Sequence, residues 1–284
     1  MLFSAKASLA LDKAVYNYRD PITIYLTLTL VDRKSFKSAS VVFCGQVHYR
    51  FSDVGNNNSS DYLINDVFCK YKAKLDQFGP GEYSPGTFLF QKTFTLPPEA
   101  SYPSFEFSSL DSTLKIEYSV RVVFESAKFF SLNVVAESPV FIRNSVRGIY
   151  SQPMVFEGEL EISRCCYLYG ICNIVFQCPR KVYTPGDLIE FQYCLDSTKA
   201  LDYQITFEEY WEFDIGHGHS VSGKNTLQRI SGNSYRLPVA MRPSVTVHCR
   251  NRGLLIHGYQ FVITIQPKGW FFCSVSKFIE IQVQ

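Results

Sequence analysis

Two eight-residue stretches decide the fold: Val15–Ile22, which reads VYNYRDPI, and Val182–Ile189, which reads VYTPGDLI. They share Val, Tyr, Asp and Ile in register, at the constant offset that takes Val15 to Val182. Pro185-Gly186 in the second stretch is an order typical of a tight turn, and apolar residues flank it on both sides. This stretch therefore predicts a strand, a tight turn and another strand. The first stretch has Tyr18-Arg19 where the second has Pro-Gly, so we expect a looser turn there.

Further motifs match between the two halves in the same order. They are Phe94–Pro97 with Tyr235–Pro238, Pro103-Ser104 with Pro243-Ser244, and Ile116–Tyr118 with Ile256–Tyr259. The separation along the chain from Leu96 to Tyr118 equals that from Leu237 to Tyr259. Motifs repeated in one order within a chain predict a duplicated domain.

Alternation of apolar and polar residues with a period of two runs through both halves and predicts strands with one buried face. The clearest runs are Ile22–Leu30, Val41–Phe51, Ile116–Phe124, Tyr259–Ile265 and Ile279–Val283. With 284 residues, the chain has room for two cores. We therefore predict an all-β protein, a tandem of two immunoglobulin-like β-sandwiches.

The predicted boundary between the sandwiches lies in residues 144–158, where Ser, Gly and Pro replace the alternation. We place the N-terminal sandwich at residues 1–145, a linker at 146–157 and the C-terminal sandwich at 158–284. Between Asp53 and Phe78 we expect a long connection. Its segment Asp61–Leu75 is the one candidate for a short helix, because Leu63, Val67 and Tyr71 are spaced by four.

The duplicated motifs resemble the arrestin family and are closest to the α-arrestins, the arrestin-domain-containing proteins. The segments that carry the resemblance best are Ser84–Pro97 and Cys165–Asp187. The resemblance covers nearly the whole chain. It implies a tandem of two sandwiches acting as an adaptor without enzymatic activity.

The resemblance also implies partners and a location. Arrestins bind cytoplasmic tails of membrane receptors or transporters, and they connect them to trafficking or ubiquitin machinery for endocytosis. We therefore expect a cytoplasmic protein recruited to the plasma membrane or endosomes. The alternative is a structural subunit of an endosomal sorting or coat complex, similar to the arrestin-like subunit of retromer.

Visual and β-arrestins read phosphorylated tails through first-strand lysines and an arginine of a buried polar core. By this resemblance the candidate phosphate-binding residues are Lys6, Lys13, Arg19 and Arg164, and the candidates for a polar core are Arg19, Asp20 and Arg164. Arginine and lysine make charge-assisted hydrogen bonds to phosphate. The alternative is that these charges pair with Asp12, Asp20 or Glu161 at strand ends.

The sequence departs from the family in several respects: Lys6 is a single lysine where the family has a pair, and Tyr18-Arg19 stands where Pro-Gly is usual. After Arg229 we find no long loop with paired aspartates, so we do not expect activation by release of a tail. Pro97-Pro98 is followed by Glu99-Ala100 rather than by a Pro-Pro-x-Tyr motif, so we do not expect ligase recruitment by that motif.

Composition excludes other classes of protein. The net charge is +2, 19% of residues are charged and 46% are hydrophobic, which argues against a disordered chain and against a nucleic-acid binder. The start of the chain lacks the order of a signal peptide, and no run of about 20 apolar residues occurs. We therefore expect the nine cysteines to be free thiols in the cytosol.

We expect no catalytic residues, metal or cofactor. Asp214, His217 and His219 are the one histidine cluster that suggests a metal site, but a solvated hairpin tip explains them better. The cysteine cluster Cys165, Cys166, Cys172 and Cys178 lacks the spacing of a zinc site, and no nucleophile or phosphate-loop motif occurs.

Basic residues in the first half suggest a weak contact with anionic lipids, to which each contributes about 1 kcal/mol near a membrane surface. They are Lys70, Lys72 and Lys74, together with Arg33, Lys34 and Lys37. An ordinary solvated face is the simpler interpretation.

Overall fold

The computed structural model describes residues 5–53, 60–98, 100–109, 112–128, 132–143, 153–164, 167–199, 201–214, 220–248, 253–268 and 273–284. Throughout these ranges every regular element is a strand, which confirms the all-β prediction. Contacts between residues divide the chain into Met1–Ser145, called unit 1, and Val146–Gln284, called unit 2.

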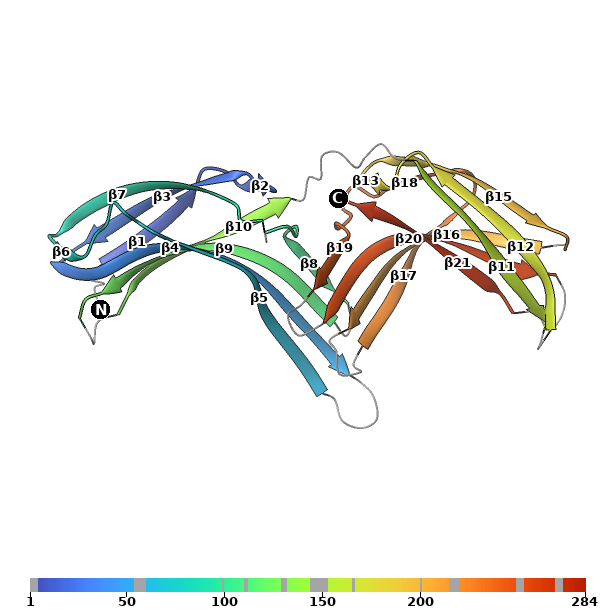
Figure 1. Cartoon of the computed structure of the whole chain (residues 1–284), viewed down its shortest axis with the longest axis horizontal. Coiled ribbons are helices and arrows are strands. Elements are labelled where there is room, and N and C mark those ends of the chain that lie inside the picture. Colours follow the sequence, from blue (N-terminus) through green and yellow to red (C-terminus); the bar gives the residue numbers. More distant parts are fainter. Residues whose placement is uncertain are drawn as a thin grey trace. The chain divides into compact units, whose positions relative to one another are not determined.

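Unit 1 is a β-sandwich (Figure 1). One sheet has the strand order β1-β3-β7, and the other has β2-β10-β9-β4-β5, with β6 paired to β4 and β8 paired to β9. The strands are β1 (Ala5–Leu11), β2 (Val15–Asn17), β3 (Pro21–Leu30), β4 (Lys34–Asp53), β5 (Ser60–Lys74), β6 (Gly81–Tyr83), β7 (Gly86–Thr95), β8 (Phe105–Ser108), β9 (Ser112–Ser126) and β10 (Val134–Arg143). Only the β2–β10 pair is parallel among the described strands of this unit.

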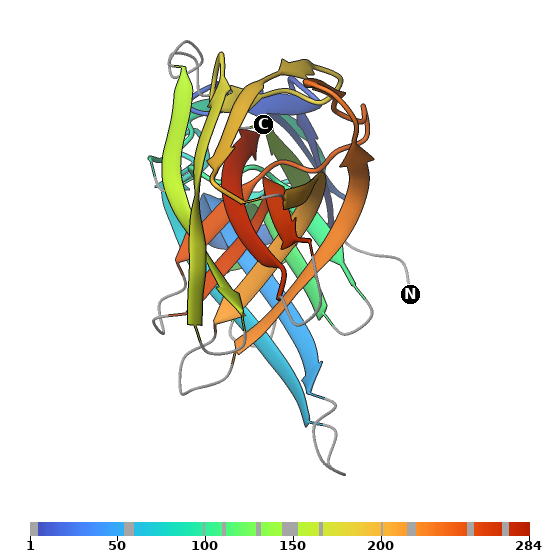
Figure 2. The same cartoon turned by 90° about the vertical axis from the view of Figure 1, so that its right-hand side faces the viewer.

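Unit 2 repeats this architecture (Figure 1, Figure 2). Its sheets have the orders β11-β12-β15 and β13-β21-β20-β16-β17, with β19 on β20, and β14 pairs with β18. The strands are β11 (Met154–Arg164), β12 (Tyr167–Cys178), β13 (Val182–Tyr183), β14 (Leu188–Glu190), β15 (Gln192–Ser197), β16 (Leu201–Asp214), β17 (Ser220–Ile230), β18 (Ser234–Arg236), β19 (Val245–His248), β20 (Leu254–Pro267) and β21 (Val275–Val283). The tandem of two sandwiches is therefore as predicted.

The predicted alternation places one face of each central strand in a core. Along β3, Ile22, Ile24, Leu26, Leu28 and Leu30 are all buried, while the residues between them are exposed or half-buried. Side chains in a strand point alternately to opposite faces, so this pattern buries one face against the facing sheet. In unit 2 the core is aromatic, with Phe176, Phe191, Phe207 and Phe261 packed ring against ring.

The expected helix over Asp61–Leu75 is wrong. This segment forms most of β5, which pairs with β4 in an antiparallel hairpin, so the long connection expected from Asp53 is also wrong. A spacing of four is a multiple of two, and Leu63, Val67 and Tyr71 therefore fit a strand as well as a helix. The ladder shifts register opposite Gly45 and Gln46, where Phe68 is the extra residue of a β-bulge.

The repeated Pro-Ser motif makes the same two hydrogen bonds in both units. In unit 1 the Ser104 N–H donates to the Ile142 carbonyl (2.8 Å), and the Ile142 N–H donates to Ser104 Oγ (2.9 Å). In unit 2 Ser244 and Val283 make the same two bonds, at 2.7 and 3.0 Å. Serine supplies both a backbone donor and a side-chain acceptor, so each motif fastens a loop to the last strand of its unit.

The region between the units is described only in part. Residues 144–152, of which 146–152 fall in the expected linker, lie outside the described ranges. β11 begins at Met154, so the last residues of the segment 146–157 belong to a strand.

Candidate functional site

The turn Asn17–Asp20 holds two of the predicted site residues. The Asp20 N–H donates to the Asn17 carbonyl (3.0 Å), and the Asp20 carboxylate accepts the Asn17 N–H (3.0 Å). Lys13 Nζ lies 3.3 Å from the same carboxylate oxygen. The backbone bond from Asn17 and the bond and charge of Lys13 hold the pKa of Asp20 below its ordinary value.

The matching turn of unit 2 is built in the same way. The Asp187 N–H donates to the Thr184 carbonyl (3.0 Å), and the Asp187 carboxylate accepts both the Thr184 N–H (2.8 Å) and an N–H of Arg180 (2.8 Å). Arg180 stands at the repeat position of Lys13 and replaces it. The expectation of a looser first turn is therefore wrong, because both turns close with the same bonds.

The two turns differ at their third residue. Gly186 has φ 90°, in the left-handed region that glycine enters freely, and Arg19 has φ 65° at the equivalent position. Arg19 is the one residue other than glycine with positive φ in the part of the chain that the structure describes. Its guanidinium lies 5.1 Å from the centre of the Tyr18 ring. A left-handed conformation costs an L-residue roughly 1–2 kcal/mol.

The variant Arg19→Gly is expected to raise the free energy of unfolding by up to about 1 kcal/mol. Glycine removes the left-handed strain, although its greater freedom in the unfolded chain offsets part of the gain. Urea denaturation of the two proteins measures the difference. The reverse change in the other turn, Gly186→Arg, should lower stability. Equal stability of wild type and Arg19→Gly would contradict the strain.

The remaining predicted cations lie apart from this turn. Lys6 is exposed near the start of β1, opposite Thr29. Lys6 and Leu11 lie roughly 17 Å apart along β1, and Lys13 and Arg19 follow Leu11. Lys6 therefore does not form one cluster with Lys13 and Arg19. Arg164 ends β11 in unit 2, opposite Tyr167, and its side chain lies outside the description. The structure thus brings Lys13 to Asp20 and leaves Arg19 exposed beside them.

The lysines suggested for lipid contact form a row. Lys70, Lys72 and Lys74 are exposed at alternate positions of β5, which is an edge strand. They therefore share one face, with neighbours roughly 7 Å apart. Lys72 lies 3.9 Å from Glu125. The lipid role stays a prediction, since lysines on an edge strand also discourage pairing with other sheets.

The other basic residues of that prediction lie near β6. Arg33 is 3.8 Å from Glu82. Lys34 is half-buried at the start of β4, and Lys37 is exposed where β4 shifts register against β9.

Sequence reasoning missed a buried ionic cluster in unit 2. His257 Nε2 lies 2.8 Å from a Glu209 carboxylate oxygen, and Arg242 donates to the same oxygen at 3.4 Å. His257 Nδ1 lies 3.2 Å from the Pro243 carbonyl. A carboxylate and a carbonyl only accept, so each of these contacts is a hydrogen bond when the facing ring nitrogen carries a proton. The His257 side chain has no exposed area.

Burial and the hydrogen-bond partners of Glu209 shift its pKa in opposite directions. Burial alone would raise the pKa of the Glu209 carboxyl, but the hydrogen bond and charge of His257 and the charge of Arg242 outweigh it and lower the pKa. The position equivalent to His257 in unit 1 is the buried Ile116. This replacement of a buried isoleucine in the first repeat by a histidine in the second is the sequence signal that points to the buried cluster.

A second buried carboxylate lies on the other face of β16. Glu208 accepts from the hydroxyls of Thr206 (3.4 Å) and Thr226 (3.3 Å) and from the Gln260 amide (3.5 Å). Lys224 Nζ lies 3.6 Å away. Buried charge is stable only when it is paired and hydrogen-bonded, and Glu208 meets both conditions.

The residues suggested for metal or redox chemistry are described in part. Cys172 and Cys178 are buried in β12, and burial raises the pKa of both thiols. Cys165, Cys166, His217 and His219 lie outside the described residues, and Asp214 ends β16. Among described side chains, no group of three or more His, Cys, Asp or Glu is placed to hold a metal.

No helix in the described ranges is long and apolar enough to cross a membrane.

The sequence matches no protein-family model and no curated protein.

Proposed function

We propose that this chain is an arrestin-like adaptor that binds cytoplasmic segments of membrane proteins, phosphorylated segments included, for endocytosis and protein trafficking. The observation that carries the proposal is the duplicated sandwich, whose turn, Leu-Pro and Pro-Ser motifs make matching hydrogen bonds in both units. In each unit the Leu of the Leu-Pro motif donates to the turn aspartate, Leu96 to Asp20 at 3.3 Å and Leu237 to Asp187 at 2.9 Å. This order of motifs is the one in which the sequence resembles arrestins.

The edge of β1 supports binding of an extended segment. In unit 2 the strand equivalent to β1 is β12, and β11 pairs along its outer edge. In unit 1 β1 pairs with β3 and packs beside β10, and it has no second ladder among the described strands. Unit 2 thus shows that this position of the fold accepts a further strand. Extended segments bind sheet edges through main-chain hydrogen bonds, while side chains give specificity.

The exposed cations suit a phosphorylated segment. Lys6 stands on β1 itself, and Arg19 is exposed with its charge beside the Tyr18 ring. Lys13 is already paired to Asp20, so we assign phosphate recognition chiefly to Lys6 and Arg19. Arg164 remains a candidate through the resemblance alone.

The test is affinity purification of the tagged protein from cells that express it, analysed by mass spectrometry with one half of the lysate treated with phosphatase. We expect membrane proteins to be recovered and to be lost after phosphatase. The double variant Lys6→Ala with Arg19→Gly should lower recovery roughly 2- to 30-fold, since exposed ion pairs contribute about 0.2–1 kcal/mol each. Glycine is chosen because it fits the left-handed turn.

Lys128→Ala is the matched control, because Lys128 is an exposed lysine of the same unit that belongs to neither turn nor edge. Full recovery by the double variant would contradict the assignment to Lys6 and Arg19. A soluble complex of fixed stoichiometry, indifferent to phosphatase, would contradict the adaptor and favour the coat subunit.

A further inference from the structure

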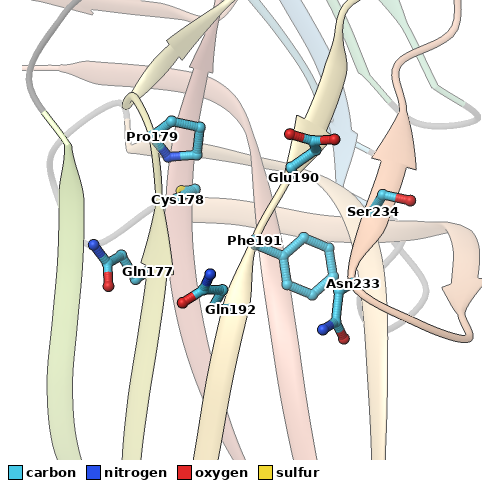
Figure 3. A pocket seen from close by; sticks show the side chains of 8 residues that line it. All are labelled: Gln177, Cys178, Pro179, Glu190, Phe191, Gln192, Asn233 and Ser234. Atoms are coloured by element: carbon cyan, nitrogen blue, oxygen red, sulfur yellow. The ribbon is translucent and has the colours of Figure 1, made fainter.

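A cavity of about 580 Å³ opens in unit 2, where the strand that contains β14 and β15 separates from β12. Figure 3 shows that strand running between β12 and β18. The lining residues are Gln177, Cys178, Pro179, Glu190, Phe191, Gln192, Asn233 and Ser234. All of them belong to the described part of one unit.

The equivalent place in unit 1 is closed. There Asp12 follows β1, and its N–H donates to the Thr23 carbonyl (3.0 Å) while its carboxylate accepts the Thr23 N–H (2.8 Å). The same carboxylate accepts the Tyr16 hydroxyl (2.7 Å). One residue thus satisfies both backbone groups of Thr23 and a buried tyrosine.

At the offset that relates the two turns, Asp12 becomes Pro179, Thr23 becomes Glu190 and Tyr16 becomes Tyr183. Proline has neither an N–H to donate nor a side-chain acceptor. The ladder between β12 and β15 ends at Gln177 and Gln192, whereas in unit 1 it continues one pair farther, to Leu11 and Ile24. The cavity therefore opens where proline replaces aspartate.

The backbone of Glu190 faces this opening. The Phe191 N–H donates to the Asn233 carbonyl (2.9 Å), so Phe191 bonds toward β18. Backbone groups of successive strand residues point to opposite sides, so the N–H and carbonyl of Glu190 point away from β18, to the side of Pro179. No residue in the described ranges of this unit bonds them as Asp12 bonds Thr23.

Tyr183 shows the same replacement from a second side. Its side chain is 1% exposed, and its hydroxyl lies against the Cys178 thiol of the cavity wall. In unit 1 the equivalent Tyr16 hydroxyl donates to the Asp12 carboxylate (2.7 Å), an acceptor that Pro179 does not have. The buried tyrosine therefore meets a thiol, a weaker acceptor, where unit 1 provides a carboxylate.

We propose that this cavity is a binding site for an extended peptide segment, one residue of which presents its N–H and its carbonyl to Glu190 where Asp12 presents an N–H and a carboxylate to Thr23. The N–H and the carbonyl of one residue in an extended segment point to the same side, so together they supply the donor and the acceptor that Glu190 requires. The side chains of Gln177, Gln192 and Asn233 offer amides, which pair with polar side chains and with further peptide groups. The Glu190 carboxylate favours a lysine or arginine in the segment and disfavours an acidic one.

This site extends the proposed function, in that it adds a second peptide site, but it does not depend on phosphate or on unit 1. The probe is a library of random twelve-residue peptides, selected against the full chain and counter-selected against Pro179→Asp. Selected peptides should slow hydrogen exchange of the Glu190 amide at least tenfold, read by nuclear magnetic resonance. In the free protein that amide should exchange faster than the Thr23 amide.

Pro179→Asp, which restores the acceptor and the donor found in unit 1, should weaken the selected peptides at least tenfold, and Pro179→Ala should weaken them less. The double variant Lys6→Ala with Arg19→Gly should leave their affinity unchanged, which separates this site from the phosphate-reading one. Library selection that yields no peptide protecting Glu190 would overturn the proposal. Equal protection by sodium acetate would also overturn it, in favour of a simple carboxylate site.

Discussion

Replacement of Glu209 by alanine is expected to lower the free energy of unfolding by about 3–5 kcal/mol, as found when one partner of a buried ion pair is removed. His257, whose side chain has no exposed area, would lose the carboxylate 2.8 Å from its Nε2, and the half-exposed Arg242 would lose the same carboxylate. Urea denaturation at pH 7, followed by intrinsic fluorescence, measures the loss.

The matched control replaces both side chains of the pair. Glu209→Leu with His257→Ile gives unit 2 an apolar pair at the place where unit 1 has Ile116, and it should recover most of the loss, since well-packed apolar residues often replace a buried ion pair without cost. An Ala variant as stable as this double variant would contradict a buried ionic cluster.

The pH dependence has a definite sign. Because the folded-state pKa of Glu209 is lowered, its contribution to stability is full above the ordinary value near 4.5 and is lost as the pH falls through the folded-state pKa. The wild type should therefore lose stability relative to the Leu/Ile variant below about pH 4.5.

The variant Gly45→Ala should lower the free energy of unfolding of unit 1 by about 1–3 kcal/mol, as overpacking of a well-packed core does. A Cβ at Gly45 would lie 2.7 Å from Cε1 of Tyr118 and 2.8 Å from Cζ of Phe68. Tyr118 cannot retreat easily, because its ring stacks on Phe43 and its hydroxyl donates to the Tyr102 carbonyl.

Gly79→Ala is the matched control, since a Cβ at Gly79 meets nothing within 4 Å. Urea denaturation of both variants measures the difference between their free energies of unfolding. A Gly45→Ala protein as stable as Gly79→Ala would show that the Phe68 bulge gives way without cost.

Much of the fold could be predicted from local pattern. The alternation of Ile22–Leu30 identifies β3 and its buried face, because a strand buried on one face imposes a period of two. The matching of Pro103-Ser104 with Pro243-Ser244 identified equivalent positions before their hydrogen bonds were known. The helix prediction for Asp61–Leu75 was wrong because a spacing of four between apolar residues fits both the period of a helix and that of a strand. Only the pairing with β4 decides between the two.

The site was less predictable, because it depends on pairs distant in sequence. Glu209 and His257 meet through the register of β16 on β20, which no local pattern reveals. The cavity, in contrast, follows from one substitution between the repeats, proline for aspartate, once Asp12 is known to bond Thr23. Sequence comparison of the halves shows that difference, but its meaning requires the hydrogen bonds of unit 1.

The described strands pair only within their own sandwich, and this has a consequence for folding during translation. Every described ladder joins strands of one unit, and many join residues far apart in sequence, such as Phe36 and Ser126. Long-range pairing is slow, and repeated halves offer each other wrong partners of nearly the right register. A ribosome releases residues 1–145 before most of unit 2 exists, so the first half meets only its own strands. Refolding from denaturant presents both halves at once and removes that protection.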